Sequence, residues 1–128
     1  MQIVADLHTH TIASTHAYST VAELARGAKN KGLIAIGITD HAPDMQDAPH
    51  EWHFYNLDIL PRKIDGVTVI RGIEFNICPG GELDHMDQNC LKPIEFSLAS
   101  FHPCCFAPST CEKHTEALEV VLKDPRVN

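Results

Sequence analysis

Four short apolar runs in this chain end in histidine or glutamate. The runs cover residues 2–8, 33–41, 66–76 and 94–102, and their β-branched content is typical of strands buried on both faces. The side chains at or just after their ends are His8, His10, His41, Glu74 and His102. In parallel α/β proteins, the loops at the carboxyl ends of the strands converge on one pocket. The sequence therefore predicts a parallel sheet with one polar site at this edge.

The first two runs are separated by the clearest helix of the sequence, predicted over residues 20–31. Its apolar residues recur at helical spacing, Thr20 with Glu23 fits a capping box, and Gly32 fits the position after the helix end. A strand, a helix and a second strand in this order predict two parallel strands joined by a right-handed crossover.

Two later segments complete the predicted α/β order. We expect residues 42–63 to form a long loop with one helical turn near 56–60, because three prolines interrupt a segment of mixed polarity. A last helix is predicted over 112–123, with Ser109 and Glu112 as its capping box.

Composition limits the class of protein. A chain of 128 residues with 44% apolar content suits one domain, and it holds no apolar run of membrane-spanning length or secretory signal pattern. We therefore expect a cytoplasmic protein whose five cysteines are reduced and buried or half-buried. The net charge of −7, without a basic stripe, argues against a nucleic-acid partner.

The residue types at the strand ends indicate metal binding. The two imidazoles of an HxH pair on a strand point to the same face, which suits two ligands of one ion. One such pair alone is more often a solvated polar tip, and a lone Glu74 or His102 is equally unspecific. Four strand ends of this kind together favour a site, and mixed nitrogen and oxygen ligands fit zinc, manganese or iron better than magnesium.

Five motifs resemble the PHP (polymerase and histidinol phosphatase) family of metal-dependent phosphoesterases, in particular its small stand-alone bacterial phosphatases of the YcdX type. They are, in chain order, DLHTHTIASTHAYS, GITDHAPD, APHEWHF, RGIEFN and FHPCCFAP. The resemblance covers essentially the whole chain. It implies a distorted (β/α)7 barrel, with a trinuclear metal cluster, usually zinc, at its C-terminal face. It also implies hydrolysis of a small phosphate monoester.

The resemblance also implies ligands for the first two ions. His8 and His10 match the pair on the first ion, and Glu74 matches the carboxylate that bridges the first and second ions. His102 matches a ligand of the second ion. We take Glu74 and His102 as the catalytic candidates as well.

The third ion would be held by His16 and His41, again by resemblance. Asp6 and Asp40 precede such ligands, and each could orient an imidazole or make an ordinary hydrogen bond at a strand end.

Three further residues are candidates for binding the substrate phosphate. His50 and His53 lie in the motif that resembles the loop near the pocket mouth, although solvated loop histidines are the commoner case. Arg71 is a candidate phosphate partner, but an arginine on a strand also pairs with a nearby carboxylate.

The resemblance implies nine metal ligands, of which this sequence supplies six. It also implies seven strands, of which this sequence supplies about four. Residues 1–128 therefore match the N-terminal part of a PHP domain. By this count the first ion keeps three ligands and the others two each, so we expect one well-occupied zinc. An unclosed barrel also leaves an open sheet edge, which predicts self-association.

Three functions stay open at this point. The first is a phosphoesterase that acts on a small phosphorylated substrate, with impaired activity in this chain. The second is a non-catalytic metal-binding product or partner subunit. The third is a nuclease-like domain, against which the acidic charge counts.

Overall fold

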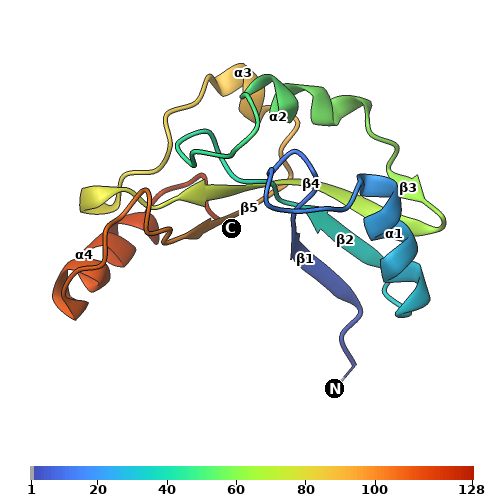
Figure 1. Cartoon of the computed structure of the whole chain (residues 1–128), viewed down its shortest axis with the longest axis horizontal. Coiled ribbons are helices and arrows are strands. Elements are labelled where there is room, and N and C mark those ends of the chain that lie inside the picture. Colours follow the sequence, from blue (N-terminus) through green and yellow to red (C-terminus); the bar gives the residue numbers. More distant parts are fainter. Residues whose placement is uncertain (1) are drawn as a thin grey trace.

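Four parallel strands curl into a half-barrel in the computed structural model, which describes residues 2–128 (Figure 1). The strands are β1 (Ala5–Thr9), β2 (Ala35–Ile38), β4 (Val67–Asn76) and β5 (Phe96–Ser100). The predicted α/β class and partial barrel are thus confirmed. Each strand begins one to three residues after the start of the apolar run that predicted it.

The long strand β4 organises the sheet. Its first half pairs with β2, which pairs in turn with β1, and its second half pairs with β5. All three pairings are parallel, as predicted. A two-residue strand that the sequence did not predict, β3 (Lys63–Ile64), pairs antiparallel with the start of β4. The carboxyl ends of the four parallel strands consequently lie along one edge.

The first helix, α1 (Val21–Asn30), follows the predicted pattern. The Thr20 side chain accepts from the Glu23 backbone N–H, and the Glu23 side chain accepts from the Thr20 backbone N–H, so the capping box is confirmed. Gly32 follows the helix end with a φ of 75°, a conformation that glycine adopts without strain. The helix places Ala25 and Ala28 in the core against the sheet.

The last helix, α4 (Cys111–Val121), begins one residue earlier than predicted. The predicted capping box of Ser109 with Glu112 is wrong. Thr110 is the cap, because its hydroxyl accepts from the Lys113 backbone N–H at 3.3 Å. None of the helices in residues 2–128 is long and apolar enough to cross a membrane.

Short helices cover the end of the barrel where the strands finish. The segment predicted as a loop contains α2 (Trp52–Asn56), which the sequence did not predict, and the turn η1 (Leu57–Ile59), which it did. Phe54 and Leu57 are buried there and fasten the segment to the core. The helix α3 (Gln88–Leu91) packs beside α2, as seen at the top of Figure 1, and the turn η2 (Pro79–Gly81) packs against α4.

The apolar core lies around β2 and β4, not β1. Strand β1 alternates half-buried and exposed residues, so the prediction that it is buried on both faces is wrong. The reason is its position, since no strand in residues 2–128 pairs with its outer side. An open groove of about 690 Å³ remains between β1 and β5, lined by apolar side chains that include Leu7, Phe96 and Leu98.

The contact between β1 and β2 depends on a glycine, which gives a test of the fold. A Cβ atom at Gly37 would lie 2.7 Å from the Leu7 carbonyl oxygen and 3.0 Å from the Leu7 Cα. We expect Gly37→Ala to lower the free energy of unfolding by about 1–3 kcal/mol, because β1 must move. Gly27→Ala on α1 is the matched control, since its Cβ meets nothing within 4 Å. This control is expected to raise the stability by about 0.5–1 kcal/mol. Urea unfolding measures both, and equal effects of the two variants would contradict the close approach.

Candidate metal centre

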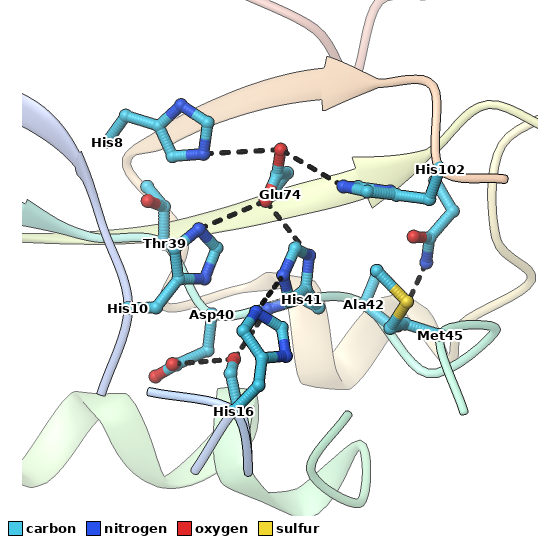
Figure 2. A network of polar contacts seen from close by, with 12 residues as sticks. His8, His10, His16, Thr39, Asp40, His41, Ala42, Met45, Glu74 and His102 are labelled. Carbon is cyan, nitrogen blue, oxygen red and sulfur yellow. Dashed lines mark hydrogen bonds and ion pairs between the residues drawn. The ribbon is translucent and has the colours of Figure 1, made fainter. Parts of the chain in front are cut away.

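The carboxylate of Glu74 is the centre of a histidine cluster (Figure 2). Its side chain is 2% exposed. Oε1 lies 3.2 Å from His8 Nε2 and 3.6 Å from His102 Nε2. Oε2 lies 3.2 Å from His10 Nε2 and 2.9 Å from His41 Nδ1. Each oxygen therefore faces two imidazoles, and the predicted residues of four strand ends meet at one carboxylate.

Strand pairing explains why these residues meet. Glu74 lies opposite Leu98 in the β4–β5 ladder, and an isolated bridge joins it to His41 just after β2. The Glu74 backbone N–H donates to the Asp40 carbonyl at 3.1 Å, which holds the end of β2 beside β4. Parallel pairing thus aligns the strand ends, as the order of elements predicted.

His16 reaches the cluster from the loop that follows β1. Its Nε2 lies 3.3 Å from His41 Nε2, and its Nδ1 pairs with the carboxylate of Asp47. His41 therefore faces Glu74 with one nitrogen and His16 with the other. The sequence analysis missed Asp47, because a lone aspartate in a polar loop gives no signal of its own.

The pKa shifts in the cluster favour an ionised Glu74 and a neutral His102. Burial opposes the ionisation of Glu74, but the contacts with His10, His41 and Ser100 outweigh it and hold its pKa well below the usual range. Burial lowers the pKa of His102, and together with the neighbouring His41 and His10 it outweighs the charge of Glu74, which raises that pKa. Metal ligation requires deprotonated side chains, so this charge state suits a ligand set.

The separations between the ligand atoms of the cluster fit the binding of metal ions. Two groups of three residues bring their ligand atoms within 4.8 Å of one another. They are His8, His10 and Glu74, and His41, Glu74 and His102. Two ligand atoms bound to one tetrahedral zinc at about 2.05 Å would lie about 3.3 Å apart, which is close to the nitrogen–oxygen separations of 2.9–3.6 Å around Glu74. Buried His41 Nδ1 and Glu74 Oε2 have no hydrogen bond of good geometry within residues 2–128. A shared cation would satisfy both atoms.

A second layer of polar contacts supports the cluster. The fully buried Asp40 accepts from the Thr11 backbone N–H at 2.7 Å and from the Thr11 and Ser14 hydroxyls at 2.8 Å. His53 Nε2 lies 3.1 Å from Asp40 Oδ2. The Ser14 hydroxyl in turn accepts from the His41 backbone N–H. Asp40 therefore fixes the loop after β1 and the start of the loop after β2 together.

The remaining candidates have other partners. Exposed His50 accepts from the Trp52 backbone N–H and lies edge-on to its ring. The Arg71 guanidinium donates to the Asp58 carboxylate at 2.8 Å and to the carbonyls of residues 58 and 60, which is the ion-pair alternative left open by the sequence. The Asp6 carboxylate accepts from the His8 backbone N–H, an ordinary strand-end hydrogen bond.

A curled parallel sheet with histidines and a glutamate at its carboxyl edge is typical of barrel-like α/β proteins that use metal ions. The chain belongs to the PHP domain family, whose sequence profile matches residues 6–123. Proteins named "Probable phosphatase" are similar to it over its whole length. They include those of Shewanella piezotolerans (50% identical, 52% of that protein covered), Shewanella sediminis (53%, 52% covered) and Acetivibrio thermocellus (49%, 53% covered). The chain thus spans about half the length of these curated relatives.

The hydrogen bonds to Asp40 predict a pH-dependent contribution to stability. Burial raises its pKa, but His53, Thr11 and Ser14 outweigh burial and lower the pKa from 3.8 to about 2. A lowered pKa in the folded state contributes stability at neutral pH, here about 2 kcal/mol, which is lost as the pH falls from about 4 towards 2. We therefore expect Asp40→Asn to destabilise the metal-free protein at pH 7 by about this amount, and by progressively less below pH 4. Urea unfolding at several pH values measures the difference. A difference that is constant with pH would contradict a role for the charge.

Proposed function

We propose that the chain carries the metal centre of a phosphoesterase that hydrolyses small phosphate monoesters. The observation that carries the proposal is the buried Glu74 carboxylate, each of whose oxygens faces two histidines. A carboxylate placed in this way can bridge two ions. The PHP domain match and the names of the relatives support a phosphatase.

The ions of such a centre lower the pKa of a bound water and stabilise charge on the phosphoryl group and the leaving oxygen. The residues of this chain would hold and orient that centre. Glu74 would bridge two ions, with His8 and His10 on one side and His102 on the other. Asp40 would hold the loops that carry His16 and His41, and so keep these imidazoles in place.

The geometry changes the number of ions expected in this chain. The resemblance assigned His41 to the third ion and left the second with two ligands. Here His41 Nδ1 faces Glu74 and joins the group that contains His102. Each of two positions then has three protein ligands, the number typical of catalytic zinc. We therefore propose two occupied positions, with zinc as the metal and manganese or iron as alternatives. The third position, at His16, would be weaker.

Metal content tests the ligand assignment. We expect purified protein to hold close to two equivalents of transition metal, because two three-residue groups are present. His8→Ala combined with His10→Ala should remove about one equivalent, since only the first group loses its imidazoles. His85→Ala, at an exposed loop histidine, is the control and should keep the wild-type content. Elemental analysis after gel filtration in metal-free buffer measures the ratio. A double variant with unchanged content would contradict the assignment.

Hydrolysis of p-nitrophenyl phosphate tests the function. With added zinc or manganese, we expect turnover. Glu74→Gln should lower the rate by at least about a hundredfold, because a neutral amide lacks the negative charge with which the carboxylate would bridge two cations. His50→Ala should keep the wild-type rate, since this exposed residue contacts Trp52 and not the cluster. Metal-loaded protein without turnover would instead favour the non-catalytic alternative.

We propose that the activity of the whole protein needs more than residues 1–128. The relatives continue over about as many residues again, and we propose that this part supplies the further ligands that the resemblance implies. Activity of residues 1–128 should then be well below that of an intact relative. A nuclease-like function is disfavoured by the net charge of −7. The cytoplasmic location stays a prediction from the sequence.

We also propose that the 128-residue chain self-associates through the open groove between β1 and β5. The open groove between β1 and β5 is apolar, Ile3 nearby is 74% exposed, and the outer edge of β1 is unpaired within residues 2–128. In a solution of purified chain, a second copy of the chain can cover this apolar area. Light scattering should therefore show a dimer or larger species, and Leu98→Glu in the groove should shift it towards monomer. A monomeric wild type at high concentration would contradict the proposal.

A further inference from the structure

Three sulfur atoms gather beside the histidine cluster. The Cys104 Sγ lies 3.1 Å from the Met45 Sδ and 3.8 Å from the Cys105 Sγ. All five cysteines are free, and Cys104 is exposed whereas Cys105 is half-buried. The prediction of buried or half-buried cysteines is therefore wrong for Cys104 and for Cys111, which is also exposed. In Figure 2, Met45 lies next to Ala42, on the same side of the cluster as His102. The group, which we call the sulfur cluster (Met45, Cys104 and Cys105), is accessible to solutes.

The loops that carry these sulfurs are fixed by hydrogen bonds. The Met45 backbone N–H donates to the Ala42 carbonyl, and the Cys105 backbone N–H donates to the His102 carbonyl at 2.9 Å. The Cys105 thiol donates to the Asp44 carbonyl at 3.4 Å and so joins one loop to the other. The sulfur atoms therefore come together without requiring the loops to order first.

The chemistry of the cluster differs from that of the histidine site. Thiolates bind Cu(I), zinc and iron–sulfur clusters, and the soft thioether of Met45 favours Cu(I) among these, because a thioether is a poor ligand for zinc. Sulfurs that share one ion at about 2.3 Å lie about 3.8–4.0 Å apart, as the two thiols already do. Met45 is closer than this, and its unbranched side chain can open the gap by rotation.

We propose that Met45, Cys104 and Cys105 form a binding site for a single Cu(I) ion. The ion is bound by two thiolates and one thioether, with the release of two protons and without any redox step. Both thiols must lose their protons when the ion binds.

The position of this site links it to the proposed metal centre. Met45 follows His41 by four residues, and Cys104 follows His102 by two. A Cu(I) ion held here would cross-link the loop after β2 to the loop after β5. These two loops carry two of the histidines that face Glu74.

Competition for Cu(I) under anaerobic, reducing conditions tests the proposal. Purified protein of residues 1–128 should withdraw one equivalent of Cu(I) from bicinchoninate. Cys104→Ser combined with Cys105→Ser should weaken this binding at least a hundredfold, and Met45→Leu about tenfold. The control Cys111→Ser changes an exposed cysteine at the start of α4 and should have no effect. His8→Ala with His10→Ala should also bind Cu(I) like the wild type, which separates this site from the proposed zinc site.

Two results would overturn the site. One is equal Cu(I) binding by the wild type and the double cysteine variant, with both shown to be folded by circular dichroism. The other is an X-ray absorption spectrum of the Cu(I)-loaded wild type with nitrogen but no sulfur ligands. This second measurement needs no variant, so a double variant that fails to fold leaves the proposal open to refutation.

Discussion

A buried carboxylate surrounded by imidazoles is the constraint on which the rest of the structure depends. Burying an ionised glutamate in the middle of a sheet is costly unless opposite charge or hydrogen-bond donors surround it. Glu74 meets that requirement only because the ends of three other strands, β1, β2 and β5, bring four imidazoles to its two oxygens. Parallel pairing, the glycine that lets β1 approach β2, and the Asp40 hydrogen bonds all act to hold those ends together.

The same carboxylate shows why much of the site could be predicted from the sequence. The positions of His41 and Glu74 near the ends of strands can be recognised in the sequence. Parallel pairing brings the ends of the strands together whatever the details of side-chain packing. The α1 cap could be predicted as well, since Thr20 and Glu23 interact within one turn. Local spacing and strand order therefore carry most of this information.

Long-range contacts account for what could not be predicted. His53 approaches Asp40 because Phe54 and Leu57 fold α2 over the strand ends, and nothing within that segment specifies this position. Arg71 is bound by the turn at residues 58–60, a contact visible only once that turn is placed. The exposure of β1 depends on what lies beyond its outer edge, which no pattern within the strand records.

The unequal exposure of the histidines has a consequence for how ions would enter and leave. The His8 side chain is 50% exposed, whereas those of His41 and His102 are 5% and 16% exposed. An ion held by His8, His10 and Glu74 would exchange quickly with solvent, and one held by His41, His102 and Glu74 would exchange slowly. The more exposed ion would therefore be the first that a chelator removes. Brief chelation would then yield a protein with a single, kinetically trapped ion.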